Sequence, residues 1–103
     1  MAGEQLSLNQ LKLTARLIAK DAIRYTPAGQ AVINCQLQYQ GQVNEAESLR
    51  NVEVNLSAIV IGSLYKTIET MNVGELAEFE GFLAHKSMRS QALVFHITNI
   101  NFN

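Results

Sequence analysis

Apolar and polar side chains alternate along five stretches of the chain, and this alternation predicts β-strands. Side chains of a strand point to opposite faces in turn, so a period of two indicates a strand with one buried face. In the first stretch, for example, Leu11, Leu13 and Ala15 alternate with charged or polar residues. The five expected strands cover residues 10–20, 31–40, 49–56, 73–84 and 92–102.

Between the third and fourth expected strands the apolar positions change to a helical period. They follow the i, i+3, i+4, i+7 spacing of an amphipathic helix, so we expect a helix over residues 58–71. Asn72 and Gly74 are suited to end it, because both tolerate the left-handed backbone conformation. The apolar positions that carry the pattern are Ile61, Leu64, Tyr65, Ile68 and Met71.

Turn-forming and polar residues separate these elements. Pro27 and Gly29 favour a turn after the first strand, because Pro fixes its own φ and Gly permits a positive φ. Residues 41–48 are polar and lack a period, so we expect a mobile loop there. Gly81 inside the fourth strand indicates a β-bulge or a tight bend. We expect residues 1–8 to be disordered.

The order of the elements is three strands, one helix and two strands, and it predicts an OB-fold. This fold is a five-stranded Greek-key barrel, here expected to be antiparallel, with the helix between strands three and four. A length of 103 residues suits a single domain over residues 1–103, and 48% hydrophobic residues supply a core. In an OB-fold the binding face crosses strands two and three, between the first-to-second and fourth-to-fifth loops.

The charged residues point to one local site. Only 17% of residues are charged and the net charge is −1, so anion binding has to come from a local patch. His85, Lys86 and Arg89 cluster in the polar segment between the last two strands, and Arg24 and Tyr25 lie in the first loop. In an OB-fold these two loops converge on the binding face. The alternative is that the cluster is only a solvated hairpin tip.

Other kinds of site find no support in the sequence. Cys35 is the single cysteine, which excludes an internal disulfide, and its apolar strand position predicts a buried, inert thiol. His85 and His96 lack ligand-spaced partners, so we expect no metal. No phosphate-binding glycine loop or Ser–His–acid set is present, so we expect neither a cofactor nor an enzyme. Without a signal peptide or an apolar run of roughly 18–20 residues, we expect a cytoplasmic protein with no membrane partner.

Three blocks of the sequence, in their order and spacing, resemble primosomal replication protein N, the PriB family. They are residues 23–29 (IRYTPAG), 52–62 (VEVNLSAIVIG) and 80–87 (EGFLAHKS), and the resemblance extends from about residue 10 to the end. That family is a bacterial homodimeric OB-fold that binds single-stranded DNA. It resembles single-stranded DNA-binding proteins in fold, and it works with the PriA helicase in replication restart.

The resemblance implies partners and site residues for this chain. The implied partners are single-stranded DNA, PriA and other primosome proteins, and a second copy of the chain. Lys86 and Arg89 match the basic fourth-to-fifth loop that contacts DNA in the family, and Arg50 matches a basic position near the start of strand three. Some members stack bases on aromatic residues in and before strand three, where this chain has polar residues such as Glu53. We therefore expect largely electrostatic DNA binding by Lys86, Arg89, His85, Arg50, Arg24 and Tyr25.

Two functions of different classes remain open. The first is a single-stranded DNA-binding accessory protein of the replication restart primosome, which stimulates PriA at stalled forks. The second is a protein-interaction adaptor built on an OB-fold with little intrinsic DNA affinity. We predict the first, and the missing aromatic residues and the net charge of −1 favour the second more than the family resemblance alone suggests. The salt dependence of oligonucleotide binding separates the two.

Overall fold

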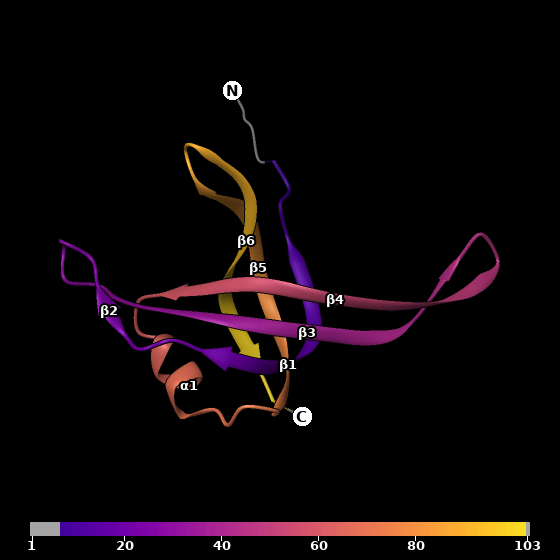
Figure 1. Cartoon of the computed structure of the whole chain (residues 1–103), viewed down its shortest axis with the longest axis horizontal. Coiled ribbons are helices and arrows are strands. Elements are labelled where there is room, and N and C mark those ends of the chain that lie inside the picture. The colour runs from indigo at the N-terminus through magenta and orange to yellow at the C-terminus, as the bar shows by residue number, and fades with distance from the viewer. Residues whose placement is uncertain (1–6, 103) are drawn as a thin grey trace.

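Six β-strands and one short helix make up residues 7–102, the part of the chain that the computed structural model describes (Figure 1). The expected disorder of residues 1–8 falls mostly on residues 1–6, which lie outside the described residues; Ser7 and Leu8 have no regular structure. The elements are β1 (Leu11–Lys20), β2 (Arg24–Tyr25), β3 (Ala31–Glu45), β4 (Ser48–Ile61), α1 (Tyr65–Thr70), β5 (Leu76–Ser87) and β6 (Ser90–Asn101).

The strands close into a barrel. Their order is β1-β5-β6-β4-β3-β2, and an additional pairing of β1 with β3 joins the sheet to itself. β1 closes the barrel, because its residues 11–16 pair with β5 and its residues 16–20 pair with β3. The register of the pairing with β3 shifts between Leu17 and Ala19. The two-residue strand β2 only extends the edge of β3. The five long strands and the helix between β4 and β5 confirm the predicted OB-fold.

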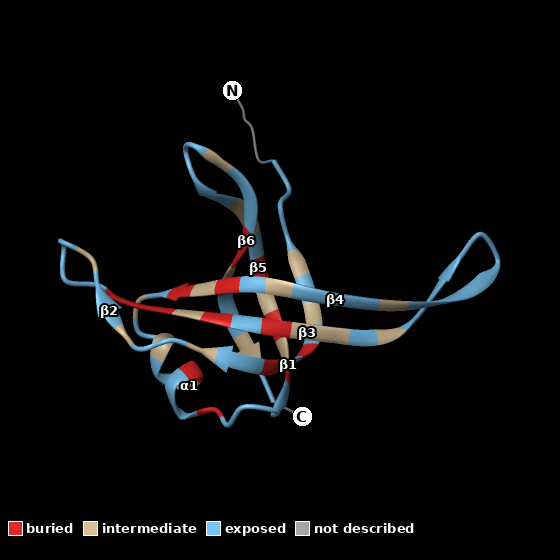
Figure 2. Ribbon diagram, in the orientation of Figure 1, coloured by how far each residue is buried: buried red, intermediate tan, exposed pale blue. Residues whose placement is uncertain are grey.

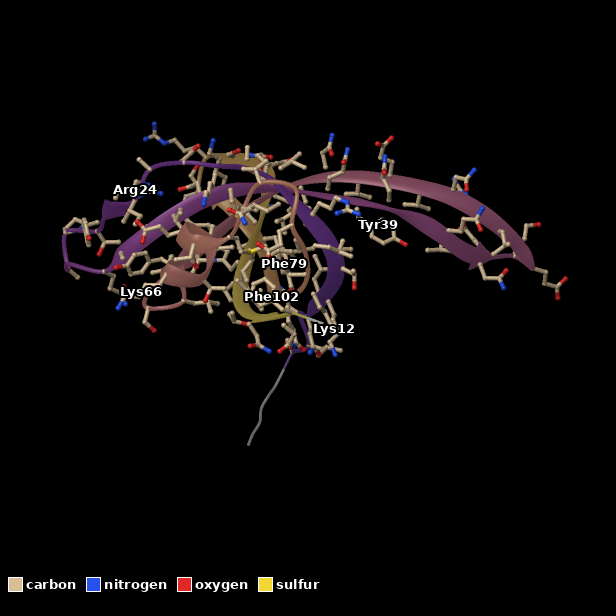
Figure 3. The ribbon with its side chains drawn as sticks, turned by 90° about the horizontal axis from the view of Figure 1, so that it is seen from below. Lys12, Arg24, Tyr39, Lys66, Phe79 and Phe102 are labelled. Atoms are coloured by element: carbon tan, nitrogen blue, oxygen red, sulfur yellow. The ribbon has the colours of Figure 1, made fainter. Side chains whose placement is uncertain are left out.

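Alternate side chains of the strands fill the barrel interior. Phe79 and Phe95 have no exposed surface, and Phe79 lies at the centre of the view in Figure 3. Around them pack Leu17, Leu37 and other apolar residues, and α1 adds Ile68 to the same cluster. Figure 2 shows this pattern as buried positions that alternate with exposed ones along the strands. The period-two pattern of the sequence therefore marked the inward side chains of β1, β3 and β5 correctly, whereas Val54 of β4 is 39% exposed and β6 buries Val94 as well as Phe95, from opposite faces.

The prediction of a helix over residues 58–71 is wrong for its first part. Residues 58–61 continue β4, where Ala58 and Val60 are buried in the barrel and the strand pairs with β3. The helix covers only Tyr65–Thr70. A short apolar run fits both a buried strand and a helix, so the strands beside it decided its conformation. Within residues 7–102 no helix is long and apolar enough to cross a membrane.

One strand pairing is parallel. β4 and β6 pair in parallel through Ala58 with Phe95 and Ile59 with His96, whereas the other pairings are antiparallel. The expected antiparallel arrangement of all five strands is therefore wrong at this junction. The parallel contact depends on residues 58–61 being strand, because it is these residues that reach β6.

The prediction of a loop over residues 41–48 is also wrong. β3 and β4 stay paired as far as Glu45 and Ser48. Ala46 and Glu47 join them with φ values of +52° and +66°, and positive φ at both central residues is the geometry of a type I′ turn, which follows the twist of a hairpin. Residues 38–45 and 48–55 form what we call the β3–β4 ribbon, which extends far from the barrel (Figure 1).

Gly81 lies at a bulge in β5, as predicted. The register between β5 and β6 shifts between Glu80 and Gly81. A Cβ atom at Gly81 would lie 1.8 Å from the backbone carbonyl oxygen of His96 on β6. Glycine is therefore required here by the close approach of two backbones.

Two basic side chains of β1 hold backbone carbonyl groups. Lys20 Nζ donates to the carbonyl oxygens of Glu69 and Met71, both at 2.6 Å, beside the C-terminal end of α1. A cation there satisfies carbonyl groups that lack partners within the helix. Arg16 Nη1 donates to the carbonyl oxygen of Gly74 at 2.9 Å. Both cations stabilise the fold, which leaves fewer of the eight basic residues for binding.

Candidate nucleic-acid interface

Polar side chains occupy one face of β3 and β4 along most of their length. Successive side chains of a strand alternate between its faces, so the even-numbered positions of β3 point away from the barrel core. From Asn34 to Asn44 these positions are all polar, and the residues opposite them on β4 are polar as well, except Ile59 and Leu49. We call this surface the amide face, and it comprises Asn34, Gln36, Gln38, Gln40, Gln42, Asn51, Glu53, Asn55 and Ser57.

Hydrogen bonds join side chains of the amide face across the two strands. Contacts between opposed side chains stabilise a sheet, and here they also order the polar groups. Glu53 is the one charged residue of the face. The bonds run from Gln38 and Gln40 Nε2 to Glu53 Oε2 (3.3 and 2.8 Å), from Gln42 Nε2 to Asn51 Oδ1 (3.0 Å) and from Ser57 Oγ to Gln36 Oε1 (3.3 Å).

His85, Lys86 and Arg89 lie at the end of the β5–β6 hairpin, as predicted. His85 and Lys86 belong to β5, and Arg89 lies in the two-residue turn before Ser90. All three side chains are exposed, and none of them takes part in the one salt bridge found within residues 7–102. The hairpin stands out from the barrel (Figure 1), so its positive charges can reach an anion.

A groove of about 260 Å³ connects this hairpin to the amide face. Its walls include Lys86 of β5, Asn34 and Gln36 of β3, and Ser57 of β4. Asp21, which follows β1, lines it as well. The barrel thus places a lysine of the hairpin beside amides that lie about fifty residues earlier in the sequence.

Arg24 joins the same site, whereas Tyr25 does not. Arg24 Nη2 donates to Asn34 Oδ1 at 3.2 Å, which holds the guanidinium beside the groove. Tyr25 is the next residue of β2 and pairs with Ala31, so it points to the other side of the strand. Its side chain is 66% exposed.

Arg50 lies apart from the other predicted DNA-binding residues. It pairs in register with Val43 near the tip of the ribbon, on the face opposite the amide face. Its Nη1 forms a salt bridge with Glu45 Oε1 at 2.5 Å. A contact between Arg50 and DNA therefore requires a strand that reaches the ribbon tip and competes with Glu45.

The prediction from sequence did not include the amides. The signal was present, because every second residue from 34 to 42 is Asn or Gln, and positions 51 and 55 are Asn. Such residues are common on the solvent side of any strand. Only the pairing of β3 with β4 shows that they form one continuous surface next to Lys86.

Nucleophilic chemistry is not supported at Cys35. Its side chain is buried, as predicted, and this burial raises the pKa of the thiol to about 12, with a smaller contribution from Asp21. The thiol is therefore protonated at neutral pH and is not a nucleophile.

His96 is stacked on Phe82 with the ring centroids 4.7 Å apart. Within the described residues 7–102, no three His, Cys, Asp or Glu side chains are grouped to hold a metal ion.

The sequence is similar to known replication restart proteins. Residues 9–99 match a family described as "Another single-strand binding protein family". The replication restart protein PriB of Bordetella pertussis is 32% identical, over 87% of this chain and 84% of its own length. The replication restart protein PriB of Neisseria gonorrhoeae is 33% identical, over 89% of this chain and 91% of its own length.

Solved structures agree with this similarity. PriB of Ralstonia solanacearum superposes with a TM-score of 0.88 at 37% identity, over 94% of this chain and 99% of that protein. The SSB domain of a Synechococcus protein superposes with a TM-score of 0.72 at 16% identity, over 96% of this chain and 100% of that domain, which shows that the fold is shared. The matches cover nearly the whole barrel, and the chain therefore belongs to the PriB family of replication restart proteins.

Proposed function

We propose that the protein binds single-stranded DNA and acts as an accessory protein of the replication restart primosome. The observation that carries this proposal is the groove in which Lys86 meets the amides of β3. Cations at such a groove contact phosphates, while a polar sheet face accommodates bases that are not paired. The PriB names of the relatives and the single-strand binding description of the family support the same function.

The binding is expected to be electrostatic and weak. Lys86 lines the groove, Arg24 is bonded to Asn34 of its wall, and Arg89 lies at the end of the same hairpin as Lys86. Lys20 and Arg16 are instead bonded to carbonyl groups. Each phosphate contact on a single strand contributes a slope of about −0.7 to the dependence of log K on log salt concentration. Three contacts therefore predict a slope of about −2.

An oligonucleotide titration tests this function. We expect a fluorescently labelled single strand to bind at low salt, with the slope of about −2 given by three phosphate contacts. The duplex of the same sequence is the control, and we expect it to bind less tightly because its bases cannot reach the amide face. If the single strand does not bind at the lowest salt concentration, the DNA-binding function is wrong.

We also propose that the protein stimulates unwinding by the PriA helicase of its own organism, as the resemblance to the PriB family implies. Unwinding of a forked substrate should be faster with the protein at saturation than without it. Equal rates would contradict the primosome function.

A protein-interaction adaptor is the second candidate, and Glu53 favours it. Its carboxylate lies within the amide face, where it repels phosphates, and the net charge of the chain is −1. An adaptor would stimulate PriA without binding the oligonucleotide. The titration and the unwinding assay together therefore distinguish the two functions.

We propose that the protein works in the cytoplasm as a symmetric homodimer. Phe82 of β5 is 38% exposed on the outer face of the barrel, and a second copy would cover such apolar surface. Sedimentation should then give the mass of two chains at micromolar concentration. A mass of one chain would contradict the dimer.

A further inference from the structure

We infer that Glu53 makes the amide face select bases with an exocyclic amino group, and in particular cytosine over thymine. This inference rests on the proposed binding of single-stranded DNA and adds base identity to it. It follows from which polar atoms of the amide face are already bonded and which remain available.

Glu53 determines how its neighbours present their amides. An ionised carboxylate only accepts hydrogen bonds, so a glutamine that bonds to it must donate its NH₂ group. Gln38 and Gln40 both donate Nε2 to Glu53 Oε2. Gln42 Nε2 likewise donates to Asn51 Oδ1. One N–H group of each of three consecutive outward glutamines is thus engaged within the protein.

The acceptors on the same part of the face remain available. Among residues 7–102, no group donates a hydrogen bond to Glu53 Oε1 or to Oε1 of Gln38, Gln40 and Gln42. These side chains belong to one sheet face, so their oxygens share one surface. The Glu53 carboxylate is the one charged group among them, so the strongest hydrogen-bonding group that remains available on this surface is an acceptor.

A hollow of about 480 Å³ lies at the same place. Gln40, Gly41, Gln42, Asn51, Val52 and Glu53 line it. Tyr39 and Val54, the neighbours on the opposite face of the ribbon, do not line it, and Tyr39 lies on the concave side of the ribbon in Figure 3. Four of its six lining residues, Gln40, Gln42, Asn51 and Glu53, belong to the amide face, and we therefore place the hollow there. Its volume is within the range of small-molecule pockets, roughly 300–1,000 Å³, so it has room for a base.

The chemistry of the bases decides which of them fits such a surface. Cytosine carries an N4 amino donor where thymine carries the O4 acceptor, and a carboxylate of Asp or Glu accepts from cytosine N4. A hydrogen bond to an ionised acceptor is also stronger than one between neutral groups. Thymine would place its O4 oxygen, an acceptor, against the Glu53 carboxylate, and it has only the single N3–H group to donate in place of the amino group. Cytosine is therefore favoured over thymine.

The cations of the site do not produce this preference. Lys86, Arg89 and Arg24 would contact phosphates, which are the same in every sequence. Glu53 also repels phosphates, and this repulsion favours an orientation with the backbone near the cations and the bases over the amide face. A difference between cytosine and thymine oligonucleotides therefore reports on the ribbon.

The test compares oligo-dC and oligo-dT of equal length, at a pH where both bases are uncharged. The wild type should bind oligo-dC more tightly than oligo-dT, by about threefold to tenfold. Glu53→Gln should bring this ratio close to one, because an amide donates to thymine O4 as readily as it accepts from cytosine N4. Glu69→Gln, which removes the same charge from the exposed surface of α1, should retain the wild-type ratio.

The ratio is the measured quantity, because removing a negative charge strengthens binding of both oligonucleotides. Circular dichroism shows that the variants are folded. Equal affinities in the wild type, tighter binding of oligo-dT, or an unchanged ratio in Glu53→Gln would overturn the inference and leave the proposed function intact. Failure of the wild type to bind either oligonucleotide at low salt would overturn both.

Discussion

The variant Gly81→Ala is expected to be unfolded, or destabilised by at least about 3 kcal/mol, because it forces two strands apart. The new Cβ atom would lie 1.8 Å from the carbonyl oxygen of His96 and 3.1 Å from Cα of Ile97. These are backbone atoms of a paired strand, so they cannot move without disrupting the pairing of β5 with β6. Urea denaturation followed by circular dichroism measures the loss.

Gly41→Ala is the matched control for this variant. Gly41 is also a strand glycine without a positive φ, and a Cβ there would lie 2.5 Å from Tyr39 Oη. That atom ends a half-buried side chain, which can rotate away. We therefore expect a loss of no more than about 1 kcal/mol. Equal stability of the two variants would contradict the structural role assigned to Gly81.

Replacing Lys86 and Arg89 together by alanine is expected to lower the affinity for single-stranded DNA at least about tenfold at low salt, because two charge-assisted contacts are lost. The salt slope should fall from about −2 to about −0.7, because two of three phosphate contacts are lost. Both side chains are exposed on the hairpin, so the fold should remain intact. Oligonucleotide titration at several salt concentrations measures the affinity and the slope.

The double variant Lys12→Ala with Lys66→Ala is the control, because it removes two positive charges elsewhere. Lys12 belongs to β1 and Lys66 to α1, and both lie lower in the view of Figure 3 than Arg24 and Tyr39. This control should bind nearly as well as the wild type. Superimposable curves for the wild type and the Lys86 and Arg89 variant would mean that the hairpin end is only a solvated turn.

The sequence by itself determined the inward side of β1, β3 and β5 and the place of the hairpin cations. A strand that buries one face needs an apolar side chain at every second residue. The alternation from Leu11 to Leu17, and the apolar Phe79, therefore showed directly which side chains point into the barrel. Gly81 was identifiable because only a glycine tolerates a close backbone approach inside a strand. The order of the elements then sufficed for the OB-fold, because few small folds place one helix at that position.

The tertiary structure alone decided the conformation of residues 58–61 and the extent of the β3–β4 ribbon. The run from Ala58 to Ile61 fits both the two-residue period of a strand and the spacing of a helix. Only its pairing with β3 and β6 makes it a strand. Ala46 and Glu47 lack the Asn-Gly or Asp-Gly signal of a two-residue hairpin, so pairing of the flanking strands had to define the turn.

The binding surface also depended on contacts between distant residues. Arg24 meets Asn34, Glu53 orders two glutamines of another strand, and Lys86 lines a groove with β3. Arg50, which the family resemblance adds to the predicted DNA-binding residues, pairs with Glu45 on the opposite face of the ribbon. A periodic pattern reports which face of its own strand a side chain occupies. It contains no information on which strand lies next to that face, because strand pairing is set by closure of the whole barrel.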